Sequence, residues 1–562
     1  MNARTLVFLV GAALVGVALL SGTGAAADVT AANADVVVGN SSTADAATIQ
    51  GGINQAPSGG TVFVESGIYA GNVTVTKSVT IVGPSATIAG TGSTNGGTGI
   101  VARAPTEVVG LSIGAIETGI AVDTNRTVRV ENVLIGDTSV AIDGTDAPGS
   151  LIVEGSQLRA NRAAIARSWP SGNLAVTNTS IDAAGRGIDV AMSSMRSSGA
   201  PSGTSVPDTT VTISNVTVVA NDSAVGVRAG DLTVDDLQVY SRSNGLTAVA
   251  GTARLTDLTV EAQGYGVVMW TANGVGLAQS QITAGTVGLG VNGGNATIQG
   301  SVIDAGTDGV VADSTNAALD SVRIDAGRDG LALSDGLFAL DTVGVTANRT
   351  AINVSAARLD ATAVSAEGWR GVHALGTVSV VLNRSDVTGT HAAIESPADG
   401  SITVSKSWLS TGTSPTVRAS GSAAVTIARS EFATTGLVVD ASGRSAPVNT
   451  TGVWWGQSGG PTEAAVSGPV ESTDPAPEPV APTAVVDRGL PVDSIDGTVP
   501  RDIDFDGQFE DFSGDGVLNF PDVNIFFQHS DRPVVTDFAQ YYDFTGEGSL
   551  NLQDVMKLFL AV

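Results

Sequence analysis

Residues 295–333 read NATIQGSVIDAGTDGVVADSTNAALDSVRIDAGRDGLAL, and this stretch contains one pattern twice. The copies start at Ala296 and Ala317, which is a step of 21 residues (317 − 296). In each copy a short alternating run is followed by an apolar residue, and then by Gly before a further apolar run. A fixed step of this size is typical of solenoid proteins, in which each repeat forms one coil.

The same pattern extends from about residue 60 to about residue 440. Apolar residues alternate with a period of two and β-branched residues are abundant, which indicates strands rather than helices. A leucine-rich repeat would add a helix to each turn, and a propeller blade needs about 40 residues. We therefore predict a parallel β-helix of about 14 to 16 coils, stacked about 4.8 Å apart into a rod of about 70 Å. The small residues that mark successive coils are Gly119, Ala141, Ala164, Gly187, Gly245, Gly266, Gly288, Gly309, Gly330, Ala351 and Gly371.

Composition excludes several function classes. The 562 residues include no Cys, which excludes disulfides, thiol nucleophiles and Cys-ligated zinc. The net charge of −28 argues against nucleic-acid binding, because that requires a basic surface. The few Lys residues (Lys77, Lys406 and Lys557) and the many acids favour a salt-adapted protein, since strong salt screens self-repulsion.

The two ends of the solenoid region have their own composition. Residues 1–27 contain Arg4, an apolar run and three Ala, and they predict a secretory signal; a retained membrane anchor is the alternative. Sequons such as those at Asn178 and Asn215 predict N-glycosylation of an extracellular chain. The β-helix is expected over 28–460, and a Pro-rich acidic linker over 461–500.

Two segments carry a resemblance to known families. TIQGGINQAPSGGTVFVESGIYAGNVTVTKSVTIVGP (48–84) resembles the opening of pectin-lyase-like right-handed β-helix proteins. VWWGQSGGP (453–461) is similar to the closing segment of NosD-like β-helix repeats. The resemblance implies an all-β, right-handed, single-stranded parallel β-helix. Residues 45–56 read as a short amphipathic helix that covers the first coil.

The predicted coil stacking brings acids and arginines into ladders on the surface. Asp304 and Asp325 lie one step apart, as do Asp308 and Asp329. An acid ladder beside an Arg ladder is an arrangement that binds a uronate polymer in polysaccharide lyases. The alternative is that these residues form solvated turns. The Asn-Thr-Asp and Gly-His-Gly signatures of the similar polygalacturonases are absent. The catalytic candidates are Asp325, Asp329, Arg328, Arg349 and Arg370.

His and Trp residues offer further candidates. His373 and His391 lie one coil apart, and either could face a groove. Trp369 could stack on a sugar ring, although packing within a turn is the alternative.

The C-terminal residues 501–562 contain two matched loops of twelve residues. DFSGDGVLNFPD (511–522) and DFTGEGSLNLQD (543–554) both have oxygen-bearing side chains at positions 1, 3, 5, 9 and 12. Gly at position 6 permits the sharp bend, and the spacing suits the six to eight oxygen ligands of Ca²⁺. The predicted ligands are Asp511, Ser513, Asp515, Val517 (carbonyl), Asn519 and Asp522, and then Asp543, Thr545, Glu547, Ser549 (carbonyl), Asn551 and Asp554.

This pair of loops resembles a type I dockerin. The resemblance implies a small α-helical calcium-binding domain that depends on its metal to fold, with a cohesin-like partner. In that family positions 10 and 11 of each loop help to select the partner, and here these are Phe520, Pro521, Leu552 and Gln553.

Three functions remain open from the sequence. The first is an exported β-helix that binds polysaccharide or surface components and is docked through the calcium module. The second is a polysaccharide lyase or glycoside hydrolase. The third is a structural spacer without a ligand.

Overall fold

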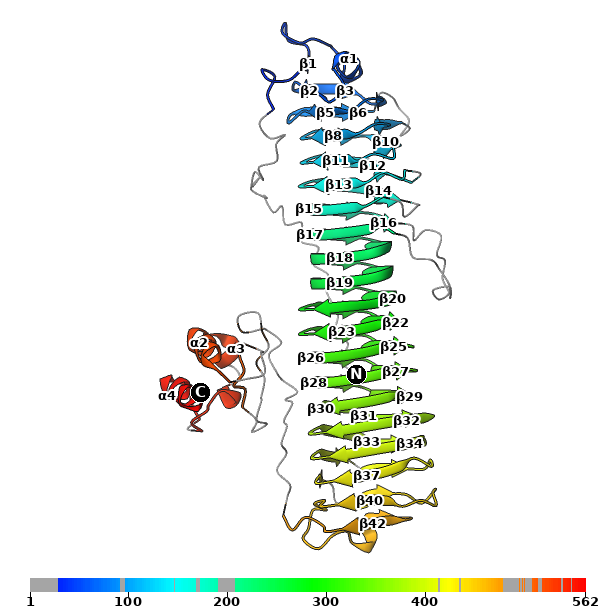
Figure 1. Ribbon diagram of the computed structural model, residues 1–562, viewed down its shortest axis with the longest axis vertical. Helices are drawn as coiled ribbons and strands as arrows, with labels where there is room; N and C mark the ends of the chain where they lie inside the picture. Colours follow the sequence, from blue (N-terminus) through cyan, green and yellow to red (C-terminus); the bar gives the residue numbers. More distant parts are fainter. Residues whose placement is uncertain are drawn as a thin grey trace, which may run out of the picture.

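The computed structural model of the chain forms a parallel β-solenoid of about 18 turns, followed by a small helical unit (Figure 1). The description covers residues 29–90, 97–145, 147–167, 172–190, 208–412, 415–433, 436–478, 495, 498, 500, 508–513, 518–536, 539–546 and 548–562. Strands make up 58% and helices 7%. The expected signal at 1–27 lies outside the described residues, as does about half of the expected linker over 461–500. The parallel β-solenoid predicted from the repeat is confirmed, with more turns than the expected 14 to 16.

The strands of the N-terminal half of the solenoid are β1 (Val36–Val38), β2 (Gly60–Val64), β3 (Gly67–Ala70), β4 (Val73–Val75), β5 (Val79–Val82), β6 (Ala86–Ala89), β7 (Thr98–Ala102), β8 (Thr106–Val109), β9 (Ser112–Gly114), β10 (Ile116–Val122), β11 (Val128–Glu131), β12 (Leu134–Asp143), β13 (Leu151–Glu154), β14 (Gln157–Arg167), β15 (Leu174–Ala183), β16 (Arg186–Val190), β17 (Thr210–Ala220), β18 (Val225–Ser241), β19 (Leu246–Ala262), β20 (Val267–Ala278) and β21 (Gln281–Ala284). Those of the C-terminal half are β22 (Leu289–Asn292), β23 (Asn295–Gln299), β24 (Val302–Ala305), β25 (Val310–Asp313), β26 (Asn316–Ala326), β27 (Asp329–Ser334), β28 (Leu337–Ala347), β29 (Thr350–Ser355), β30 (Arg358–Thr362), β31 (Ser365–Leu375), β32 (Thr377–Asn383), β33 (Asp386–Ser396), β34 (Asp399–Ser405), β35 (Trp408–Thr411), β36 (Val417–Ala419), β37 (Ala424–Ala428), β38 (Glu431–Phe432), β39 (Val439–Asp440), β40 (Val448–Thr451), β41 (Val466–Ser467) and β42 (Val470–Thr473).

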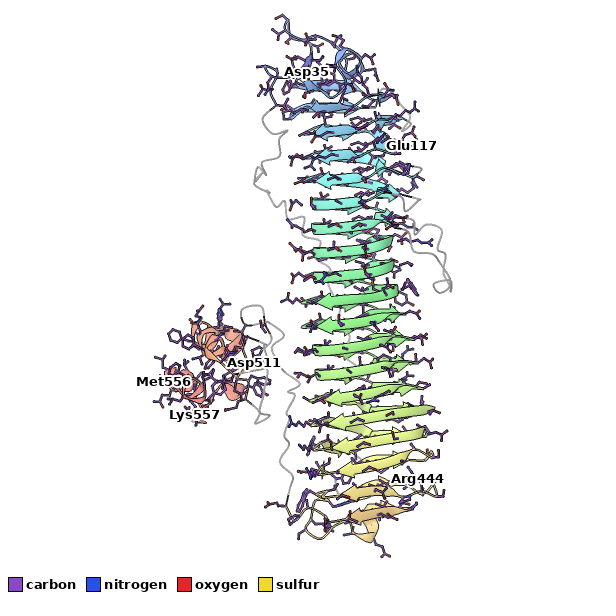
Figure 2. The ribbon with its side chains drawn as sticks, viewed as in Figure 1. Asp35, Glu117, Arg444, Asp511, Met556 and Lys557 are labelled. Carbon is purple, nitrogen blue, oxygen red and sulfur yellow. The ribbon has the colours of Figure 1, made fainter. Side chains whose placement is uncertain are left out.

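The core of the solenoid consists of aliphatic side chains stacked from coil to coil. Ile282 of β21 is in register with Ile303 of β24, which in turn is in register with Ile324 of β26 and then Val345 of β28. All four are at most 2% exposed. Because the interior is narrow, Val, Ile, Leu and Ala fill it, and few aromatic residues are needed. The same alternation turns every second side chain outward, as Figure 2 shows.

The small residues that mark the repeat lie where successive coils approach most closely. A Cβ atom added to Gly309 would overlap the Ile324 side chain and would lie 2.5 Å from the carbonyl oxygen of Gly330. Gly288 and Gly330 meet equivalent obstacles in the coil that follows each of them. The Gly and Ala at this point of the repeat are therefore required by the spacing between coils.

A second corner of the coil was not recognised in the sequence. Here a residue with left-handed backbone geometry recurs, for example Asp257 (φ 54°) and Lys406 (φ 50°). In several coils the next residue is a buried serine. The Ser385 backbone N–H donates to Ser407 Oγ at 3.0 Å, and the Ser407 N–H donates to Ser430 Oγ at 3.1 Å. These serines supply partners for backbone groups that the turn would otherwise leave without one.

A helix covers the N-terminal end of the solenoid, as predicted. Helix α1 (Ile49–Gln55) buries Ile49 and Ile53 against the first coil and, in Figure 1, lies beside β1 at the end of the solenoid. The Gln50 side chain accepts from the Thr74 N–H at 2.8 Å and donates to the Thr74 carbonyl at 3.1 Å. The helix therefore provides hydrogen-bond partners for part of the open strand edge. Unpaired backbone groups at such an edge would otherwise favour edge-to-edge association.

The C-terminal end of the solenoid extends into the Pro-rich range. Strands β41 and β42 pair with β39 and β40 and belong to the last coil, although the composition placed them in the linker over 461–500. Phe432 and Trp455 close the core there, with their ring centroids 4.8 Å apart.

The C-terminal unit is formed by described residues between 508 and 562 and has its own core. Its elements are α2 (Phe520–His529), α3 (Pro533–Thr536), the 3-10 helix η2 (Ala539–Tyr541) and α4 (Leu552–Ala561). The aromatic rings of Phe512, Phe526 and Tyr542 pack together, with the Phe512 and Phe526 centroids 4.9 Å apart. No helix within the described part of the chain is long and apolar enough to cross a membrane.

Candidate functional site

The two C-terminal loops have the same internal hydrogen bonds. In the first loop, the carboxylate of Asp522 accepts from the backbone N–H of Ser513 at 2.7 Å and from that of Asn519 at 2.7 Å. In the second loop, Asp554 accepts from the N–H of Thr545 at 3.0 Å and from that of Asn551 at 2.8 Å. Each loop is therefore closed by its position-12 carboxylate.

These position-12 residues also begin the helices that follow. Asn519 and Asn551 are the N-caps of α2 and α4, and Asp522 and Asp554 occupy the third helical position of a capping box. An aspartate at position 12 thus closes the loop and starts the helix with the same side chain.

Four loop carboxylates are withdrawn from solvent, namely Asp511, Asp522, Asp543 and Asp554. Asp522 and Asp554 are fully buried, and no ion pair among the described residues includes either of them. A buried carboxylate without a counter-charge is costly, so this donor set fits a hard divalent cation. Asp515, Val517 and Glu547, which were predicted to complete the ligand sets, lie outside the described residues.

Helices α2 and α4 expose an apolar surface. We call the exposed side chains Phe520, Phe527, Leu552, Met556 and Phe559 the apolar face. Phe520 and Phe559 join its two halves by an edge-to-face contact with centroids 6.3 Å apart. Figure 2 labels Met556, which is 56% exposed at the surface of the unit.

The apolar face contains half of the residues that were predicted to select a partner. Phe520 and Leu552, at position 10 of their loops, are 61% and 67% exposed. Pro521 and Gln553, at position 11, are exposed beside them.

On the solenoid, the arginines of the predicted ladder form ion pairs with acids of neighbouring coils. Arg328 Nε donates to Asp308 at 2.7 Å, and Arg349 Nε donates to Asp329 at 2.8 Å. Thr350 takes the next place after Asp308 and Asp329 (308 + 21 = 329; 329 + 21 = 350), so Arg370 pairs instead with Glu395 of the following coil. These guanidinium groups thus link coil to coil.

Asp325 and Asp329, two acids of the predicted ladder, lie on different strands. Asp329 begins β27, and its carboxylate is 4% exposed and bonded to Arg349. Asp325 lies near the end of β26, beside Asp304 of the preceding coil. Burial and the charge of Asp325 raise the pKa of Asp304. The structure therefore does not combine Asp325 and Asp329 into one site.

An ion pair of this kind makes a measurable prediction. Replacing Arg349 by Met removes the partner of the buried Asp329 carboxylate, so we expect a loss of about 1–3 kcal/mol in unfolding free energy. The double variant with Asp329→Asn should recover part of this loss. Arg103→Met, which removes a well-exposed pair with Asp123, is the control and should cost at most about 1 kcal/mol in urea unfolding. Equal losses for the two single variants would contradict the assignment.

A row of polar side chains crosses the outer face of one sheet near these ion pairs. Register places Asn353, His373, Glu395, Arg418 and Asp440 next to one another on β29, β31, β33, β36 and β39. We call these five residues the polar row. The sequence pointed only to His373, because the outward position of each coil is identified only once the strand register is known.

Trp369 and His391 lie close to the polar row. Their rings stack with centroids 4.3 Å apart, and the Arg370 guanidinium lies 4.4 Å from the Trp369 ring centroid. Burial and nearby arginines lower the pKa of both His373 and His391, and burial is the larger cause. Trp369 thus packs against His391 and Arg370, and 41% of the residue remains exposed.

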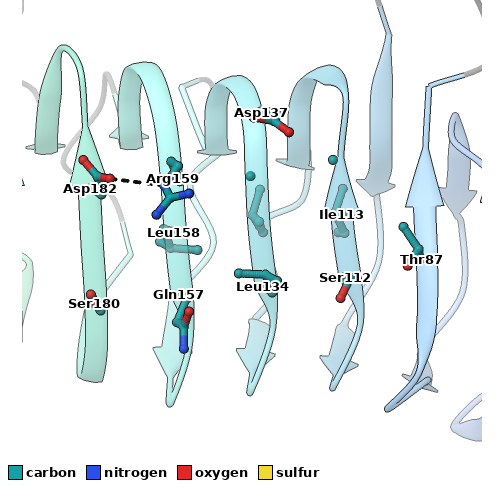
Figure 3. A pocket seen from close by; sticks show the side chains of 13 residues that line it. Thr87, Ser112, Ile113, Leu134, Asp137, Gln157, Leu158, Arg159, Ser180 and Asp182 are labelled. Carbon is teal, nitrogen blue, oxygen red and sulfur yellow. Dashed lines mark hydrogen bonds and ion pairs between the residues drawn. The ribbon is translucent and has the colours of Figure 1, made fainter. Parts of the chain in front are cut away.

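A groove of about 490 Å³ lies nearer the N-terminal end, over β9, β12, β14 and β15 (Figure 3). Its floor is low because Gly114 and Gly136 have no side chains, and the pair formed by Arg159 and Asp182 (3.1 Å) lies on its rim. The uncharged polar side chains along it are Thr87, Ser112, Gln157 and Ser180, and Asp137 adds a carboxylate. None of these residues was predicted as a candidate site from the sequence.

Comparison with known proteins adds no family to this description. No protein-family model matches the chain, and no curated protein matches it.

Proposed function

We propose that this chain is an exported, tethered β-solenoid. Its C-terminal unit binds two Ca²⁺ ions and docks to a partner protein, and its solenoid binds polysaccharide or another surface component. The observation that carries the proposal is the pair of equivalent loops, with buried carboxylates, that leads directly into helices with an exposed apolar face.

The docking role is supported by where the apolar surface lies. Six large apolar side chains, those of the apolar face and Leu560, are exposed on two short helices, which is a high share for so small a unit and is typical of an interaction surface. The resemblance of the loops to type I dockerins supports a cohesin-like partner. The position-10 and position-11 pairs differ between the loops, Phe-Pro against Leu-Gln, so the two halves offer unequal surfaces.

The solenoid role is supported by the length of its regular outer faces. The groove combines hydroxyl, amide and charged groups on a rigid sheet, and the polar row combines an amide, an imidazole and charged groups. The resemblance of residues 48–84 to pectin-lyase-like, right-handed β-helices is consistent with a polysaccharide ligand. Catalysis has weaker support, because the ladder arginines Arg328 and Arg349 are already engaged by aspartates. A ligand-free spacer would leave the polar row without a role.

The proposed location and medium follow from composition. The apolar N-terminal segment and the sequons support export and glycosylation, and the charge of −28 supports a protein adapted to high salt, as in halophilic archaea.

The docking proposal predicts calcium-dependent capture through the apolar face. We expect the immobilised full chain to retain a partner from cell-envelope extract with calcium and to lose it with EGTA. Phe520→Asp and Leu552→Asp should each weaken capture by about tenfold or more, because a carboxylate in a buried apolar contact is costly.

Gln528→Asp, which adds the same charge at an exposed polar position of α2, is the matched control and should retain capture. Equal capture by the Phe520→Asp variant, or capture that is insensitive to EGTA, would overturn the proposal.

A further inference from the structure

The polar row lies on the outside of the solenoid wall. Its members alternate with fully buried neighbours, as Asn353 does with Ile352 and Val354. Each member of the row is half-buried between the side chains of adjacent coils. The row thus faces outward, and its side chains are held in place by the neighbouring coils.

The chemistry of this row changes abruptly along the rod. The four preceding coils place small or apolar residues at the same register position, and the coil before them has Thr247 there. The four residues are Val268, Gly290, Val311 and Ala332. From Asn353 onward six consecutive coils place a polar or charged residue there, and the last of these is Ser467 of β41, beyond the polar row. Solubility does not require this change, since the earlier coils are exposed to the same solvent.

Part of the hydrogen-bonding capacity of the row is unused. The Arg418 Nε and the Asn353 Oδ1 are both buried, and neither has a hydrogen-bond partner among the described residues. An unsatisfied polar atom costs about 1–3 kcal/mol, and a ligand recovers this cost where a small side-chain movement brings the buried atom to the surface. One of these atoms is a donor and the other is an acceptor.

The charges of the row cancel once the ion-pair partner of Glu395 is counted. Within the row Arg418 carries one positive charge and Glu395 and Asp440 carry two negative ones (+1 − 2 = −1), and Arg370, which pairs with Glu395, brings the sum to zero. His373 has a lowered pKa and is neutral at pH 7, so its ring offers one donor and one acceptor nitrogen. The row therefore presents donors and acceptors in alternation rather than a field of one sign.

We propose that the polar row binds an uncharged, hydroxyl-rich glycan chain that lies along the rod. Hydroxyl groups both donate and accept, which matches a row that offers both. Five coils at about 4.8 Å span about 19 Å, enough for several sugar units on a rigid template. A peptide strand is a poor fit, because strand addition requires an open sheet edge and this is a paired sheet face. The inference rests on the proposal that the solenoid binds polysaccharide and is independent of docking.

Affinity electrophoresis of the full chain with calcium tests this inference. Gels contain a neutral β-glucan, mannan or dextran, or the uronate polymer polygalacturonate. We expect retardation by at least one neutral glycan, and about tenfold weaker binding for Arg418→Met. Arg254→Met removes the same charge from an exposed site on another sheet and should bind normally. If Arg418→Met fails to fold, Asn353→Asp retains the shape of the side chain, adds a carboxylate and should weaken binding similarly.

Three results would overturn the inference. They are retardation that is equal in the Arg418 and Arg254 variants, retardation by polygalacturonate that exceeds retardation by neutral glycans, and no retardation by any glycan. With calcium-dependent capture intact, the first two leave the proposed function standing, whereas the third removes its polysaccharide component.

Discussion

Removal of calcium with EGTA is expected to unfold the C-terminal unit while the solenoid remains folded. A unit of about 60 residues holds only about 3–5 kcal/mol in its core. Two sites that are saturated at a thousand times their dissociation constants would add about 8 kcal/mol. Without the ions, the buried carboxylates of Asp522 and Asp554 have no counter-charge and destabilise the folded unit. The unfolded form of the unit is then the more stable one.

Hydrogen exchange followed by mass spectrometry measures this effect directly. Peptides from residues 508–562 should exchange at least about a hundredfold faster in EGTA, and those from β1 to β42 should not change. Asp554→Asn should behave in calcium much as the native chain does in EGTA over its own loop. Asp531→Asn, at an exposed position between α2 and α3, is the control and should leave exchange unchanged. Protection that persists in EGTA would contradict the calcium assignment.

Gly309→Val is expected to disrupt the solenoid at one coil. The new Cβ would overlap the Ile324 side chain and meet the backbone of Gly330, and a backbone atom cannot move aside cheaply. Overpacking of this kind costs about 3 kcal/mol or more. Because each coil contacts only its neighbours, the loss should be concentrated in β24 to β28.

Gly344→Val provides the matched control. It is the same substitution, 35 residues away (344 − 309), at an outward position where nothing lies within 4 Å of an added Cβ. Its effect on the urea unfolding midpoint should stay within about 0.5 kcal/mol, and valine should favour the strand. Similar midpoints for the two variants would show that the spacing between coils does not select small residues.

The repeat could be predicted because residues close together in the sequence determine it. Gly309 and Gly330 indicate where successive coils approach closely, and the alternation of apolar and polar residues around Ile324 indicates a strand. The second corner was missed, because its left-handed position accepts Asp257, Lys406 and Gly300 alike and leaves no common residue type. The number of coils was underestimated, since the short strands at both ends depart from the step of 21 residues.

The candidate sites also differ in how far the sequence alone could predict them. The loop of Asp511 to Asp522 is contiguous, so spacing alone indicates its chemistry. The polar row draws Asn353, Glu395 and Arg418 from separate coils, and only the strand register brings them together. The ladder arginines recur at the step of the repeat, but the acid with which each one pairs depends on the neighbouring coil.

The constant register from β23 to β28 makes the solenoid a ruler. Ala296, Ala317 and Phe338 follow one another at identical intervals, so an added copy of residues 296–316 would fit between existing copies without a new turn. Such an insertion would move every later coil outward by about 4.8 Å and preserve its contacts. Duplication of single repeats could therefore lengthen the solenoid one coil at a time during evolution. Helix α1 at the N-terminal end and the two loops of the C-terminal unit would stay unchanged.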